Sequence, residues 1–294
     1  MSPWFPSSPC TTARCVDVPM RAAGPLRRAL RALAVVLVVL AGVLVARLTW
    51  GTARRRVTAL WSRALLRALG VRVEVRQGFA FFAGAAGAAG AASSGAPGPE
   101  APEPEARLVV ANHISWLDPL VVAATMPCRL VAKREVGSWP VVRGLAGGAG
   151  ALPIARDSLH GLPGAVASIA DVLRSGESVA AFPEGTTWCG RGSGTFKPAV
   201  FQAALDAGAR VTPVALVYRE SSGPRTTAPA YVGDDTLVAS LLRVIAVRRL
   251  VVEVTVLPPV TASSRRELAD LAEAAVASAT GRLPALRPAL AASA

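Results

Sequence analysis

The chain is poor in histidine and cysteine, the side chains that most often bind transition metals. Its 294 residues include two histidines and four cysteines, and no pair of cysteines has the CxxC spacing of a zinc site. We therefore interpret Cys10, Cys15, Cys128 and Cys189 as free thiols in a reducing compartment, without a disulfide framework or a metal site. The GxSxG motif is also absent, which argues against an acyl-enzyme serine.

Acidic residues are scarce in the amino-terminal part of the chain. Residues 1–76 hold thirteen arginines and only two acids, Asp17 and Glu74, which gives +11 of the total net charge of +13. A nucleic-acid-binding protein usually spreads its basic residues over the folded domain. Here the arginines flank an apolar segment, so we expect membrane lipids with anionic head groups, and no nucleic acid, as partners.

The apolar segment runs from Ala32 to Ala46 between Arg31 and Arg47. A helix of this length spans roughly 22 Å, less than the ~30 Å hydrocarbon core, unless flanking arginines reach out to the head groups. We interpret it as a membrane anchor, spanning or half-inserted, with a cleaved signal peptide or a buried core helix as alternatives. Residues 54–69 form a predicted amphipathic helix, which would lie in the membrane interface or pack on the domain.

Composition divides the chain into regions of different character. The predicted regions are a disordered tail at 1–20, membrane-anchoring helices at 21–70, a main domain at 71–283 and a second tail at 284–294. Within the main domain, residues 78–106 consist of Gly-Ala and Pro-Glu repeats that cannot supply a core. We expect them to form a flexible low-complexity insertion.

Strands and helices are expected to alternate from residue 107 onward. Alternation of apolar and charged residues predicts an earlier strand at 71–76. Apolar runs predict strands at 108–111, 129–132, 151–154, 178–182, 211–217 and 250–257, and helices are predicted at 161–175, 198–208 and 264–281. Gly176 and Gly208 stand where helices should end. The pattern predicts an α/β fold, with a mixed central sheet flanked by helices and an N-terminal membrane-associated helical segment.

The strongest local signal is the run from Asn112 to Pro119, with the sequence NHISWLDP, directly after the predicted strand at 108–111. Sites in α/β folds lie at strand ends. In a tight turn the Asp118 carboxylate can reach the His113 imidazole, fix its tautomer and stabilise the imidazolium. The simpler alternative is a histidine that caps a turn, with Asp118 as the N-cap of the next helix.

A second block, FPEGTT, starts at Phe182 after another predicted buried strand. The Glu184 carboxylate and the amides around Gly185 could face a polar ligand, because glycine permits close backbone approach. Taken alone, this block is an ordinary turn.

Taken together, these blocks resemble the motifs of the glycerolipid acyltransferase family, whose best-known members are the 1-acylglycerol-3-phosphate acyltransferases. The family's NHxSxxDP motif is matched by Asn112, His113, Ser115, Asp118 and Pro119; its FPEGT motif by residues 182–186; and its V-x-P-V element by Val211, Pro213 and Val214. The family's second motif is matched at Gly150, Ile154 and Arg156, but Ala155 replaces an acid or Asn. That departure leaves the substrate head group open.

The resemblance implies that residues 71–283 form an acyltransferase domain. It would move a fatty acyl group from acyl-CoA or acyl carrier protein to the free hydroxyl of 1-acylglycerol 3-phosphate, forming phosphatidic acid. His113 would be the general base, with Asp118 orienting it. The substrate-binding residues would be Asn112, Ser115, Arg156, Glu184, Gly185 and Thr186, with Lys133 and Lys197 as further phosphate ligands or as ordinary solvated lysines.

Other functions remain open at this stage. The acceptor could be glycerol 3-phosphate, a lyso-ornithine lipid or a glycolipid, and the protein could instead be a thioesterase or a non-catalytic lipid-binding adaptor. No metal or organic cofactor is expected. Because acyl-CoA and acyl carrier protein are cytosolic, we expect the domain at the cell membrane, facing the cytoplasm. The oligomeric state is left unassigned.

Overall fold

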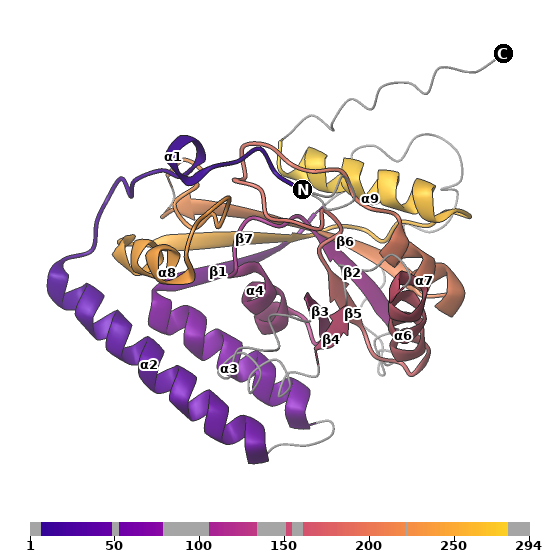
Figure 1. The fold of residues 1–294 in the computed structure, drawn as a ribbon, viewed down its shortest axis with the longest axis horizontal. Coiled ribbons are helices and arrows are strands. Elements are labelled where there is room, and N and C mark those ends of the chain that lie inside the picture. The colour runs from indigo at the N-terminus through magenta and orange to yellow at the C-terminus, as the bar shows by residue number, and fades with distance from the viewer. Residues whose placement is uncertain are drawn as a thin grey trace, which may run out of the picture.

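The computed structural model describes residues 7–48, 53–78, 106–133, 151–154, 161–221 and 223–281. These residues form a seven-stranded sheet with the strand order β1-β7-β6-β2-β5-β3-β4 (Figure 1). The strands are β1 (Val71–Gln77), β2 (Arg107–Ala111), β3 (Arg129–Lys133), β4 (Leu152–Ile154), β5 (Val179–Ala181), β6 (Arg210–Glu220) and β7 (Leu250–Val256). Only the β6–β7 pair is antiparallel within this sheet, which confirms the mixed sheet.

Helices cover both faces of the sheet. One face packs against α2 (Pro25–Leu48), α3 (Ala53–Leu69), α4 (Asp118–Thr125) and α8 (Leu237–Ala246). The other packs against α6 (Leu162–Arg174), α7 (Ala199–Ala207) and α9 (Arg265–Ala279) (Figure 1). Strand β2 therefore has no polar face: Val109 and Ala111 contribute to the first core, and Leu108 and Val110 to the second.

Most predicted elements are found close to their expected bounds. Gly208 caps α7 with a φ of 63°, and Gly176 follows α6 with a φ of 83°, a region that glycine enters without a Cβ penalty. Helix α8 was not predicted. Its start is marked by Thr236, whose hydroxyl accepts from the Ala239 amide at 3.2 Å.

The amino-terminal tail differs from its prediction as a disordered segment. Residues 7–20 lie on the domain and include the short helix α1 (Thr12–Cys15). The backbone amides of Met20 and Arg21 donate to the Glu220 carboxylate at 2.9 and 3.1 Å, and the Asp17 amide donates to Thr227 Oγ1 at 2.9 Å. These partners lie some two hundred residues away along the chain, so the local Pro/Ser composition does not predict them.

The predicted anchor is the middle of α2. Residues Pro25–Val45 of this helix are long and apolar enough to cross a membrane, and 6% of the segment is buried. Helix α3 runs back beside it (Figure 1), and Trp61 Nε1 of α3 donates to Val38 O of α2 at 2.9 Å. Helix α3 packs on the domain, the second of its two predicted alternatives, with Leu66 and Leu69 fully buried. The two helices thus form a hairpin attached to the domain.

Several predictions fall outside the described residues. These concern residues 79–105 of the predicted insertion, the tail beyond Gly281 and the first six residues.

Candidate active site

The site forms where two neighbouring parallel strands end. Strand β2 ends at Ala111 and β5 at Ala181, and their carboxyl ends share one edge of the sheet. The loops that follow are joined by backbone contacts: the His113 amide donates to Glu184 Oε2 at 2.8 Å, and the Trp188 amide donates to His113 O at 2.8 Å. The Phe182 ring stacks on the imidazole, with centroids 4.3 Å apart.

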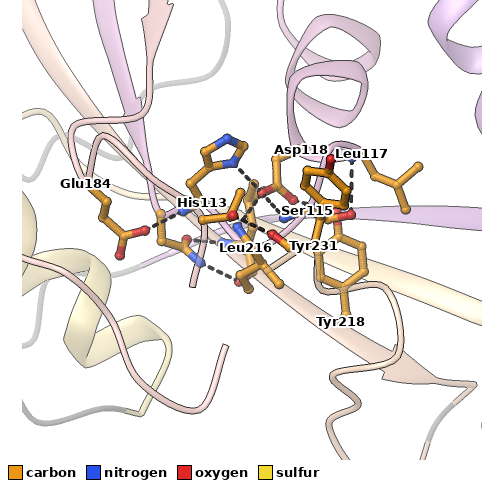
Figure 2. Close-up of polar contacts among 11 residues, drawn as sticks. His113, Ser115, Leu117, Asp118, Glu184, Leu216, Tyr218 and Tyr231 are labelled. Atoms are coloured by element: carbon orange, nitrogen blue, oxygen red, sulfur yellow. Dashed lines mark hydrogen bonds and ion pairs between the residues drawn. The ribbon is translucent and has the colours of Figure 1, made fainter. Parts of the chain in front are cut away.

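His113 and Asp118 form the central pair of this site (Figure 2). The imidazole Nδ1 lies 2.9 Å from Asp118 Oδ2, and the same oxygen accepts from the amides of Ile114 and Ser115 at 2.6 and 2.8 Å. A carboxylate that accepts from amides also accepts from Nδ1–H, so in the neutral imidazole the lone pair is on Nε2. Asp118 is fully buried, whereas the His113 side chain is 18% exposed. A buried carboxylate thus orients a ring that can still be reached.

Asp118 does not act as the helix N-cap. Helix α4 begins at Asp118 itself, and Leu117 occupies the N-cap position without a side-chain bond. The carboxylate is turned back toward the preceding loop instead, where it binds the amides and the imidazole. Pro119 follows in the first turn, as predicted.

Tyr218 is a part of the site that the sequence did not reveal. Its hydroxyl donates to Asp118 Oδ1 at 2.6 Å from the neighbouring strand β6 (Figure 2). Burial, together with the charge of Asp118, raises the pKa of Tyr218 well above its ordinary value, so the hydroxyl stays protonated and donates. The one available signal was its place on β6, four residues after Val214 of the V-x-P-V element.

Asn112, Ser115 and Glu184 lie at the site with buried side chains, 1%, 0% and 2% exposed. Asn112 bridges β2 to β6, since Nδ2 donates to Leu216 O at 3.0 Å and Oδ1 accepts from Leu216 N at 2.8 Å. Ser115 Oγ accepts from the Leu117 amide, and Glu184 Oε1 from the Gly194 amide, both at 3.3 Å. These polar atoms hold the loops, and their substrate contacts stay predictions.

The structure describes some of the other predicted substrate-binding residues, and the rest lie outside its described part. Gly185 has a φ of 74°, which explains glycine there, and Thr186 beside it is half-buried. The Lys197 side chain is exposed, and its amide donates to Pro183 O at 2.9 Å. Arg156 and the side chain of Lys133 lie outside the described part of the structure. The phosphate-binding role of these residues stays a prediction.

In the part of the chain that the structure describes, His113 and Asp118 lie outside the cluster of potential metal ligands. Among the described residues, the group of three metal-ligating side chains is Cys10, Cys15 and Cys189, and it does not include His113 or Asp118. The imidazole, which Asp118 orients and which is partly exposed, has the geometry of a group that can accept or donate a proton.

Comparison with known proteins agrees with this geometry. Residues 98–217 match the Acyltransferase family model. A 1-acyl-sn-glycerol-3-phosphate acyltransferase of Neisseria gonorrhoeae is 39% identical over 151 residues, which is 51% of this chain and 59% of that protein. A lyso-ornithine lipid O-acyltransferase of Pseudomonas aeruginosa is 38% identical over 172 residues, 58% of this chain and 66% of that protein. The chain thus spans about three fifths of the curated relatives it matches.

A solved structure shares the fold. It is the 1-acyl-sn-glycerophosphate (LPA) acyltransferase PlsC of Thermotoga maritima, with a TM-score of 0.60 and 17% identity over 90% of this chain and 97% of that one. The motifs that meet at the ends of β2 and β5 lie within the matched family model. Residues 98–217 of this chain thus form a domain of the Acyltransferase family, and the chain is similar to glycerolipid acyltransferases.

Proposed function

We propose that the chain transfers a fatty acyl group from acyl-CoA or acyl carrier protein to the free hydroxyl of 1-acylglycerol 3-phosphate, forming phosphatidic acid. The observation that carries the proposal is the 2.9 Å contact between His113 Nδ1 and the buried Asp118 carboxylate. Relatives named as 1-acyl-sn-glycerol-3-phosphate acyltransferases support the choice of acceptor.

The pair suits direct transfer between the two substrates. Nε2 of His113 takes the proton of the acceptor hydroxyl while its oxygen attacks the thioester carbonyl. Asp118 stabilises the imidazolium that forms, and the stacked Phe182 ring limits rotation of the imidazole. Collapse of the tetrahedral intermediate breaks the carbon–sulfur bond, and the imidazolium returns the proton to the leaving thiolate.

Replacing His113 tests the base. We expect His113→Ala to lower kcat by about 10²–10⁴-fold, the usual contribution of a positioned acid–base group, while the variant keeps its circular dichroism spectrum. His160→Ala is the matched control, because His160 is the chain's other histidine, and it should keep wild-type activity. Substantial transfer by a folded His113→Ala variant would exclude His113 as the base.

A lyso-ornithine lipid is the second candidate acceptor, favoured by the relative from Pseudomonas aeruginosa. A panel of 1-acylglycerol 3-phosphate, glycerol 3-phosphate, lyso-ornithine lipid and a lysoglycolipid, run with both thioester donors, compares kcat/KM directly. A higher kcat/KM for lyso-ornithine lipid than for 1-acylglycerol 3-phosphate would show that lyso-ornithine lipid is the preferred acceptor. Thiol release from acyl-CoA without any acceptor would indicate a thioesterase, and no turnover with any pair would indicate a lipid-binding adaptor.

We further propose that the helical hairpin lies in the cytoplasmic face of the membrane and does not span it. Arginines stand near both ends of α2, and Arg54-Arg55-Arg56 begin the return helix. A single span would place these two groups at opposite faces of the membrane, whereas an in-plane hairpin leaves both at the anionic head groups of the cytoplasmic face. Protease treatment of sealed inside-out vesicles should remove the domain. Protection there, with cleavage in right-side-out vesicles, would reverse the orientation.

A further inference from the structure

Three of the four cysteines gather at one place. Cys10 and Cys15 come from the amino-terminal segment, and Cys189 comes from the loop after β5. Their three sulfur atoms lie within 4.8 Å of one another. The sequence predicted free thiols but not that three of them meet, because Cys189 is far from Cys10 and Cys15 along the chain.

The geometry suits a metal ion bound by thiolates. Tetrahedral zinc with Zn–S bonds of about 2.3 Å holds its sulfurs about 3.8 Å apart, so the observed cluster needs only a small contraction. Cys10 and Cys15 are separated by four residues, within the C-x₂₋₄-C spacing of zinc sites. The turn of α1 (Thr12–Cys15) links the two.

The cluster is screened from bulk water, and one of its sulfur atoms has backbone partners. The backbone amides of Arg191 and Gly192 donate hydrogen bonds to the Cys189 sulfur, as outer partners of metal ligands do. Cys10 and Cys189 are 6% and 4% exposed, which keeps water from competing for them. Cys15 is only half-buried, so an ion can enter from its side.

We propose that Cys10, Cys15 and Cys189 bind one Zn²⁺ through three thiolates, with water in the fourth position. Each thiol gives its proton to solvent on binding, and no electron is transferred. A disulfide would use two sulfurs and leave the third, whereas a soft divalent ion uses all three. The site is independent of the acceptor that the enzyme uses.

The ion would connect the membrane-proximal segment to the active-site loop. Cys10 and Cys15 precede α2 in the chain, and Cys189 directly follows Trp188, whose amide donates to His113 O at 2.8 Å. Metal binding would therefore fix the loop that holds the backbone of the catalytic histidine. This role is structural, so it is measured first by binding and stability and not by turnover.

Cobalt titration of the full chain, purified under reducing conditions and stripped with a chelator, tests the proposal. We expect one Co²⁺ per chain, thiolate-to-cobalt charge-transfer absorption, and displacement by one Zn²⁺. Cys10→Ala, Cys15→Ala and Cys189→Ala should each weaken binding by about 100-fold or more, since even outer-shell partners are worth about 10–100-fold. Cys128→Ala is the matched control: Cys128 is buried outside the cluster, and its loss should leave binding unchanged.

Thermal unfolding gives a second measurement. Zn²⁺ should raise Tm in the wild type and in Cys128→Ala but not in the cluster variants. If Cys189→Ala does not fold, Cys15→Ala at the partly exposed position gives the decisive comparison. Absence of stoichiometric cobalt binding, equal binding by Cys15→Ala, or a disulfide within the cluster by mass spectrometry of the reduced protein would overturn the proposal.

Discussion

Asp118 is the residue on which the geometry of the candidate active site depends. Its two carboxylate oxygens accept four hydrogen bonds, from the imidazole, two backbone amides and the Tyr218 hydroxyl. None of these four donors is an arginine or a lysine. The negative charge is thus held in place by dipoles, so in the proposed mechanism it is available to stabilise an imidazolium at His113.

Tyr218→Phe should lower kcat with little change in KM. The variant loses one charge-assisted hydrogen bond to Asp118, worth about 1.5–3 kcal/mol, and Tyr218 is 2% exposed and so does not meet substrate. We expect kcat to fall by about 10–100-fold. Steady-state kinetics measure the effects on kcat and on KM separately. Tyr231→Phe is the control, because Tyr231 contacts the site through its backbone. An equal rise in KM, or unchanged kcat, would contradict a positioning role.

Because of Cys128, the free energy of unfolding should fall as the pH rises in the alkaline range. Burial raises the pKa of this thiol to about 12 in the folded chain, above the ~8.5 of an exposed thiol. Because the pKa of Cys128 is higher in the folded chain, the thiol ionises first in the unfolded chain. Its contribution to the free energy of unfolding is therefore complete below about pH 8.5 and is lost as the pH rises toward 12. Between pH 8 and 9.5 this loss is about 1 kcal/mol.

Urea unfolding of the wild type and of Cys128→Ala at both pH values measures this contribution. The variant should be less stable at pH 8 but should lose about 1 kcal/mol less than the wild type over the interval. Parallel pH profiles for the two proteins would show that Cys128 ionises at an ordinary pKa.

Single residues of the site were predictable only where the signal was local. The spacing from His113 to Asp118 sufficed to predict their contact, because both lie in one turn. Tyr218 stands one hundred residues from Asp118, and only strand pairing brings it there. Asn112 and Ser115 were predicted to bind substrate, but a sequence motif cannot show that their side chains are turned inward toward backbone partners.

At the scale of elements, the strands were predictable because burial on both faces requires continuous apolar runs. The arginines at both ends of the anchor favoured a hairpin, but the packing of α2 on α3 was not predictable, since it includes a close approach between residues of the two helices. A Cβ on Gly42 would lie 2.1 Å from Trp61 Nε1, and Trp61 is held by its bond to Val38 O. Glycine at this position lets the two helices touch.

Gly42→Ala should destabilise the hairpin even though alanine is the better helix former. The added methyl group forces Trp61 out of its place, at a cost of about 1–3 kcal/mol, more than the ~1 kcal/mol gained in propensity. Gly164→Ala in α6 is the matched control, because nothing lies within 4 Å of its Cβ position, and it should stabilise. Thermal unfolding in detergent compares them, and equal shifts in Tm would show that the helices are not in contact at Gly42.

At the scale of the whole molecule, helix α2 joins an exposed apolar surface to an arginine that binds the domain. The outer face of α2 exposes Leu26, Leu30, Leu33, Leu37, Leu40 and Leu44. Its base is fixed to the domain, since Arg31 Nη1 donates to Ile245 O and Val247 O at 2.9 and 2.6 Å. Sequence predicted an anchor but not this attachment, which depends on carbonyl groups two hundred residues away. Because Arg31 ties α2 to the domain, binding of α2 to a membrane would also restrain the orientation of the domain.

Removing the arginines at the start of α3 should weaken binding to anionic membranes without affecting the fold. Each arginine near an anionic surface contributes about 1 kcal/mol, so replacing Arg54, Arg55 and Arg56 together by Gln should reduce affinity for phosphatidylglycerol vesicles about 100-fold. Affinity for neutral phosphatidylcholine vesicles should change little, and the difference should shrink at high salt. The control replaces the exposed pair Arg265 and Arg266 by Gln at the start of α9, on the opposite face of the sheet. Vesicle co-sedimentation measures both variants. Equal losses would mean that the whole surface, and not the hairpin, attracts the lipid.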